Sequence, residues 1–95
     1  MLLLISYDLK QPDRDYSSLY DTIKNAGSSW WHYLESVWII KTDMSVDCCS
    51  NLLLRNMDTN DLLFVVDITG KKSQGWLPSK AWEWLKSQDI NNSKG

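Results

Sequence analysis

The chain has 95 residues, a length that fits one domain and leaves little surplus of buried core. Its net charge of −2, with acidic and basic residues well mixed, excludes a generally basic surface that binds nucleic acid tightly. A local basic patch stays open, and six tryptophans are more indole than one small core needs, which indicates an aromatic interface.

The two cysteines, Cys48 and Cys49, are adjacent and cannot form an unstrained disulfide with each other. Reduced thiols predict a cytoplasmic protein. Only His32 adds a further soft ligand, so a zinc site is not expected. No apolar run approaches the length of a membrane span, and we expect no membrane partner.

The first predicted strand, Met1–Tyr7, is apolar on both faces for most of its length. A polar loop, KQPDRD, follows it. Asp13 or Asp15 is expected to cap a helix that ends near Ala26, before Gly27. The apolar positions of this helix recur at helical spacing: Tyr16, Leu19, Tyr20 and Ile23.

The aromatic and β-branched segment SSWWHYLESVWIIKT predicts two strands, Trp30–Tyr33 and Ser36–Lys41. No Asn-Gly or Asp-Gly pair marks the turn, so one long bent strand is the alternative. A second helix is expected in DMSVDCCSNLLLRNM, with Asp43 or Ser45 as its cap. Its predicted buried positions are Val46, Cys49, Leu53 and Met57.

The last part of the chain predicts a strand at Asn60–Thr69, a Gly-bounded turn and a short helix at Pro78–Ser87. In this helix Trp82 and Leu85 share a face, and Trp84 is expected to point elsewhere. Residues 1–87 are therefore interpreted as one domain, and residues 88–95 as a flexible polar tail.

The predicted order is β-α-β-β-α-β followed by a short C-terminal helix, which is the order of a ferredoxin-like α+β sandwich. Right-handed crossovers place both main helices on one face of a four-stranded antiparallel sheet. Because the strands are apolar on both faces, the other face needs a cover. A second copy of the chain is the simplest one, and we expect a homodimer.

Three segments carry a family resemblance: Leu4–Asp8 (LISYD), Glu35–Trp38 (ESVW) and Asn60–Val66 (NDLLFVV). With them, residues 1 to about 70 resemble the CRISPR-associated Cas-two family of small ferredoxin-like homodimers. The chain is even more similar to small bacterial proteins known as SinR-like, a group without a settled function. The Trp-rich segment near the C-terminus is not part of either pattern.

The resemblance implies a role for Asp8, which matches the acid at the end of strand one in the Cas-two family. In some members that acid is linked to a divalent metal and to nuclease activity, whereas other members are structural scaffolds. Asp8 from both chains of a dimer would hold one Mg²⁺ or Mn²⁺ ion for phosphodiester hydrolysis. Asp8 could equally organise the following loop by accepting backbone N–H groups. Ser6, on the same strand face, and Ser36, in the second motif, are supporting candidates.

A nucleic-acid site is the third hypothesis. Trp30, Trp31 and His32 could stack on bases, with His32 as an acid or base. The alternative, which the absence of basic residues between the rings favours, is a strand with alternate rings buried. Basic candidates near the site are sparse: Lys10, Arg14 and Lys41.

The sequence is therefore compatible with three functions. The first is a homodimeric interaction or scaffold module without efficient catalysis, with another protein subunit as an additional partner. The second is a metal-dependent endonuclease that uses paired Asp8 residues. The third is a weak binder of single-stranded nucleic acid. The net negative charge disfavours the second and third functions, and the large number of tryptophans favours the first.

Overall fold

The four strands form one antiparallel sheet in the spatial order β2-β3-β1-β4, which confirms the ferredoxin-like α+β fold. The computed structural model describes residues 1–93, with side chains as far as Gln88. In chain order the elements are β1 (Leu2–Asp8), α1 (Ser17–Ala26), β2 (Ser29–Leu34), β3 (Val37–Lys41), α2 (Val46–Leu54), β4 (Leu62–Asp67) and α3 (Ser79–Ser93). The central strands are β1 and β3, and the edges are β2 and β4.

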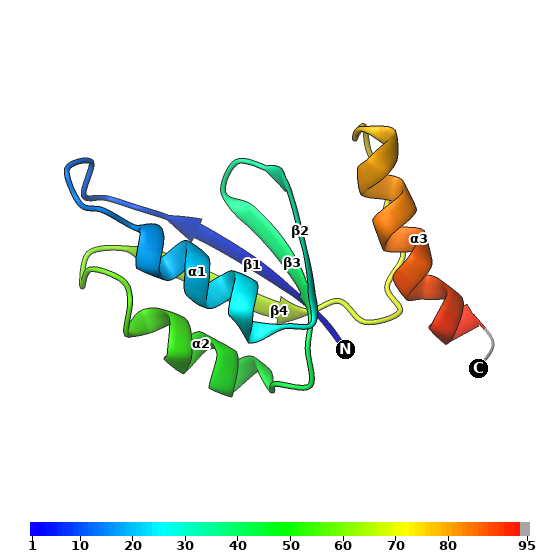
Figure 1. Ribbon diagram of the computed structural model, residues 1–95, viewed down its shortest axis with the longest axis horizontal. Coiled ribbons are helices and arrows are strands. Elements are labelled where there is room, and N and C mark those ends of the chain that lie inside the picture. The colour runs from blue at the N-terminus through cyan, green and yellow to red at the C-terminus, as the bar shows by residue number, and fades with distance from the viewer. Residues whose placement is uncertain (94–95) are drawn as a thin grey trace.

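One face of the sheet is covered by α1 and α2, which lie side by side (Figure 1). Alternate residues of β1 point into this layer, where Leu3 and Ile5 are fully buried. They meet Leu19 and Ile23 of α1 and Cys49 and Leu53 of α2. Apolar residues at alternate positions of the strands and at helical spacing in α1 and α2 thus meet in the main core, as the sequence predicts.

The opposite face carries a second, smaller core built with α3. Leu2, Trp31 and Ile39 are buried there against Ala81. The indole N–H of Trp31 donates to the carbonyl oxygen of Ala81 at 3.2 Å. The chain's own C-terminal helix therefore covers part of the face for which the sequence analysis expected a second copy.

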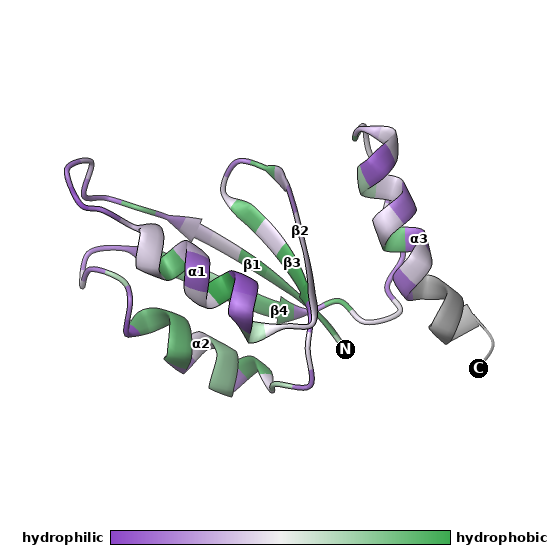
Figure 2. Cartoon of the chain, viewed as in Figure 1, coloured by the Kyte–Doolittle hydropathy of each residue, from purple (hydrophilic) through white to green (hydrophobic). Residues whose placement is uncertain are grey.

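The helix α3 differs from its prediction in length and orientation. It continues to Ser93, beyond the expected end at Ser87. Trp84 does not point away from the sheet, because it packs on the second core and its indole N–H donates to Ser29 Oγ at 2.7 Å. Figure 2 shows that α3 is more hydrophilic than α2, as expected for a helix with one partly covered face. Residues 94 and 95 of the expected tail lie outside the described part.

The helix α1 begins later than predicted, and its cap differs. Its N-terminal flanking residue, Tyr16, makes no side-chain cap bond. Asp15 instead accepts the backbone N–H of Ser17 at 2.9 Å, which shapes the entry turn. The helix α2 follows the prediction more closely, since Ser45 Oγ accepts the backbone N–H of Cys48.

The strands β2 and β3 form a tight hairpin and not one bent strand. Glu35 and Ser36 make the turn between the paired residues Leu34 and Val37. Non-glycine residues with positive φ are absent from the described residues, so this turn is not a mirror-image type. An irregular register between Trp31 and Leu34 accommodates it.

Within residues 1–93, no helix is both long enough and apolar enough to cross a membrane.

Candidate functional site

Asp8 ends β1 on the face of the sheet opposite Tyr7, and its carboxylate lies open to solvent. Its Oδ2 is 2.7 Å from Lys10 Nζ. The side chain of Asp8 is 60% exposed and that of Lys10 is 46% exposed. An ion pair this exposed adds little stability, about 0–1 kcal/mol. Asp8 is therefore accessible, but its charge already has a partner.

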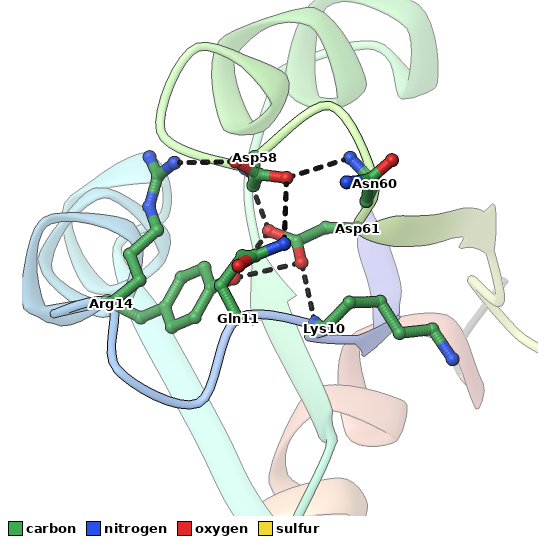
Figure 3. A network of polar contacts seen from close by, with 7 residues as sticks. Lys10, Gln11, Arg14, Asp58, Asn60 and Asp61 are labelled. Carbon is green, nitrogen blue, oxygen red and sulfur yellow. Dashed lines mark hydrogen bonds and ion pairs between the residues drawn. The ribbon is translucent and has the colours of Figure 1, made fainter.

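The buried acid at this end of the sheet is Asp61, directly before β4 (Figure 3). Its Oδ1 accepts the backbone N–H of Lys10 at 2.7 Å, and its Oδ2 accepts that of Asp58 at 2.8 Å. The Tyr16 hydroxyl lies 2.9 and 2.8 Å from the two oxygens. One carboxylate thus fastens the loop after β1 to the loop before β4. The loop-organising role considered for Asp8 belongs to Asp61.

Hydrogen bonding outweighs desolvation at Asp61. Burial alone would raise the pKa of this carboxyl, because it penalises the charged form. The backbone N–H groups of Lys10 and Asp58, the Tyr16 hydroxyl and the nearby Arg14 guanidinium together lower the pKa below its ordinary value. Asp61 is therefore held ionised as a structural anion.

Asp58 forms an outer layer of the same network, as Figure 3 shows. It accepts the backbone N–H of Asn60 at 3.0 Å and the side-chain amide of Gln11 at 3.4 Å. Arg14 Nη1 lies 3.7 Å from its Oδ1, and the Arg14 guanidinium also sits 5.3 Å from the Tyr16 ring centre. Arg14 is thus occupied by the loop network.

Asp58, Asp61 and Tyr16 were not predicted from the sequence as a unit. Asp58 and Asp61 stand three apart just before a strand, a spacing typical of a side-chain-stabilised turn. Tyr16 was counted only as an apolar position of α1. The pairing of these residues spans 45 positions, and no local pattern reports such a contact.

An aromatic row lies on the helix-covered face of the sheet, beside α1. The His32 ring stacks on the Trp38 ring, with centres 3.7 Å apart and planes 4° apart. Trp30 and Tyr20 flank Trp38 at 5.4 and 6.2 Å. Lys24 Nζ lies 5.1 Å from the Trp30 ring centre, and Trp30 is 44% exposed. Of this row, Trp30 is exposed and Trp38 is buried.

His32 is fixed within this row by its hydrogen bond. Its Nδ1 lies 2.9 Å from the Val37 carbonyl oxygen, which places a proton on Nδ1 because a carbonyl only accepts. His32 faces the helices, whereas Asp8 faces the other side of the sheet. The two residues therefore do not form an acid–base pair.

The predicted nucleic-acid residues do not form one surface. Trp31 points away from Trp30 and His32 and is buried beneath α3, at 2% exposed. Lys41 pairs in register with Leu2, at the far end of β1 from Lys10 and Arg14. Alternation along β2 thus divides the aromatic cluster between two faces, as the alternative interpretation expected.

Apart from Lys10, the neighbours of Asp8 across the β1–β4 pairing are apolar. Asp8 lies directly opposite Leu62 on β4, and Ser6 lies opposite Phe64. Leu62 is 58% exposed and Phe64 is 63% exposed. With Val66 they form the β4 strip, an apolar row on the open face of an edge strand. Large apolar side chains exposed together at a sheet edge make the β4 strip a candidate interaction surface.

Ser36 lies in the β2–β3 turn, near the same end of the sheet. Its carbonyl oxygen accepts the backbone N–H of Tyr7 at 3.2 Å. Its side chain is exposed, as Ser6 is in part. No group of three or more His, Cys, Asp or Glu side chains within the described part of the chain is arranged to hold a metal ion.

In comparisons with known proteins, no family model and no curated sequence matches this chain.

Proposed function

We propose that the chain is a homodimeric interaction or scaffold module without efficient catalysis, resembling the non-catalytic members of the Cas-two family and acting in the cytoplasm. The observation that carries this proposal is the β4 strip. Two large apolar side chains, Leu62 and Phe64, stand exposed beside an acid that is already ion-paired.

A second copy of the chain suits the strip for two reasons. A twofold axis places the strip against its own equivalent, so one row of apolar residues supplies both halves of the interface. The strip also lies on β4, whose outer edge has no neighbouring strand in the sheet of residues 1–93. The face that remains after α3 covers Trp31 and Ile39 is smaller than the whole-sheet interface first expected.

Sedimentation equilibrium at micromolar concentration tests this proposal. The wild type is expected at twice the chain mass of 11.0 kDa. Phe64→Asp places a charge in the strip and should give the mass of one chain. Leu54→Asp is the matched control, because Leu54 is 49% exposed on α2, away from the strip, and should leave the dimer intact. A wild type of single-chain mass, or equal effects of both substitutions, contradicts the proposal.

A metal-dependent endonuclease is the second candidate, favoured by one observation. Asp8 lies opposite Leu62, so a twofold axis through the strip would bring two Asp8 carboxylates toward each other. The ion pair with Lys10 stands against it, because a bound cation would have to displace the ammonium group. An assay for cleavage of single-stranded DNA and RNA in the presence of Mg²⁺ or Mn²⁺ tests this second candidate function. Activity in the wild type that Asp8→Asn abolishes would establish the nuclease.

A further inference from the structure

A cavity of about 340 Å³ lies between the open face of the sheet and the C-terminal segment. The sheet contributes Leu2, Leu4 and Ile39, and the C-terminal segment contributes Leu77 and Leu85. Two indole rings, of Trp31 and Trp82, complete the apolar wall. The lining is thus hydrocarbon and aromatic on both sides, and it belongs to neither the aromatic row nor the β4 strip.

Two exposed lysines line this cavity. Lys71 and Lys72 come from the loop that joins β4 to α3, and no acid is among the lining residues whose side chains are described, as far as Gln88. Neither lysine is in an ion pair with the described residues. Gly70 and Gly75 bound this loop with φ of 70° and 157°. Such backbone angles suit glycine, so the glycines set the course of the chain that carries the lysines.

The acid nearest in sequence, Asp67, is influenced by Lys71. Hydrogen bonds from Thr69 are the main reason that the pKa of Asp67 is lowered, and Lys71 adds a smaller effect. The Asp67 carboxylate accepts the Thr69 N–H at 2.9 Å and its hydroxyl at 2.6 Å. The hydrogen bonds of Asp67 are therefore made within its own loop, and Asp67 forms no ion pair with Lys71 or Lys72.

We propose that this cavity binds a small amphipathic carboxylate, with the aliphatic chain against the leucine and tryptophan side chains and the carboxylate between Lys71 and Lys72. An apolar wall with a few convergent polar groups is the usual form of a small-molecule site. The volume is at the low end of the range for such sites, about 300–1,000 Å³, which favours a short chain over a full-length lipid. The two lysines in the lining select an anion over a neutral alcohol.

Calorimetric titration of hexanoate, octanoate and octanol into the full chain tests the proposal. Each buried methylene strengthens binding roughly fourfold, so octanoate should bind about 15-fold more tightly than hexanoate. Octanol should bind more weakly than octanoate. Equal affinities for the two acids, or no binding of octanoate at millimolar concentration, would overturn the proposal.

Paired lysine variants separate a defined site from general attraction to basic residues. Lys71→Gln with Lys72→Gln should weaken octanoate binding roughly three- to tenfold, the effect of two partly exposed charge contacts, and leave octanol binding unchanged. Lys80→Gln with Lys86→Gln makes the same change in net charge on α3, away from the lining, and should leave octanoate binding unchanged. If both double variants weaken octanoate equally, the carboxylate does not sit between Lys71 and Lys72 and the proposal fails.

A third variant tests the cavity itself. Leu34 is 47% exposed at its rim, so Leu34→Trp is expected to fold and to narrow the opening. Binding of octanoate should fall at least tenfold. Unchanged binding in a folded Leu34→Trp chain would place the ligand elsewhere. If Leu34→Trp does not fold, the lysine variants are sufficient to test the proposal.

Discussion

Asp61→Asn should destabilise the protein far more than Asp8→Asn, although the two chemical changes are identical. Asp61 is buried and accepts from two backbone N–H groups and the Tyr16 hydroxyl. Hydrogen bonds to a charged acceptor contribute about 1.5–3 kcal/mol each. An asparagine keeps one acceptor oxygen but turns an N–H₂ group toward a donor. We expect the free energy of unfolding to fall by about 2–4 kcal/mol.

Asp8→Asn is the matched control, since it removes only an exposed ion pair and should cost less than about 1 kcal/mol. Urea unfolding followed by tryptophan fluorescence measures both variants, and equal slopes against urea show that the unfolded states are comparable. If the free energies of unfolding of the two variants differ by less than about 0.5 kcal/mol, Asp61 does not fasten the two loops together and the prediction is wrong.

The effect of Asp61 should also depend on pH. Its pKa in the folded state is lowered, so the folded state holds the ionised form more strongly than the unfolded state does. Its contribution is fully present above the unfolded pKa of about 4 and is lost as pH falls through the folded pKa. The difference in stability between wild type and Asp61→Asn should be constant from pH 5 to 7 and shrink below about pH 4. A difference that grows on acidification would contradict the assignment.

Three further predictions concern the two cores. Trp31→Phe removes one of the hydrogen bonds between β2 and α3, and should lower the free energy of unfolding by about 1–2 kcal/mol and increase amide exchange in α3. Gly27→Ala should cost about 1–3 kcal/mol in urea unfolding, because an added Cβ would clash with the Lys41 carbonyl oxygen. Burial raises the pKa of the Cys49 thiol while Cys48 is exposed, so a thiol reagent should label Cys48 first, and Cys48→Ser should remove the fast phase.

The sheet, the two main helices and their shared face follow from local patterns in the sequence. Alternation in β1 and helical spacing at Leu19 and Ile23 are enough to define which side chains meet. Ser45 as the cap of α2 was predictable for the same reason, because a cap is local chemistry. The observed strand ends differ from the predicted ones by one or two residues, because hydrogen bonding to the neighbouring strand determines where a strand ends.

The position of α3 and the network around Asp61 could not be predicted in this way. The pattern of α3 identifies a helix, but its place over Trp31 depends on a contact 50 residues away in sequence. Asp61 and Asp8 look equivalent in sequence, because each adjoins an apolar strand: Asp8 is the last residue of β1 and Asp61 directly precedes β4. Only the fold shows that Asp61 faces three donors while Asp8 faces solvent. The acid that the resemblance singles out and the acid that the fold buries are therefore different residues.

We infer that Asp8 is an exposed ion-pair partner beside the β4 strip and not a metal ligand. Calorimetric titration of Mg²⁺ and Mn²⁺ into the wild type and Asp8→Ala tests this inference most directly. We expect no saturable binding in either protein. Binding of one ion per dimer, lost in Asp8→Ala, would contradict the account and make the paired carboxylates a metal site.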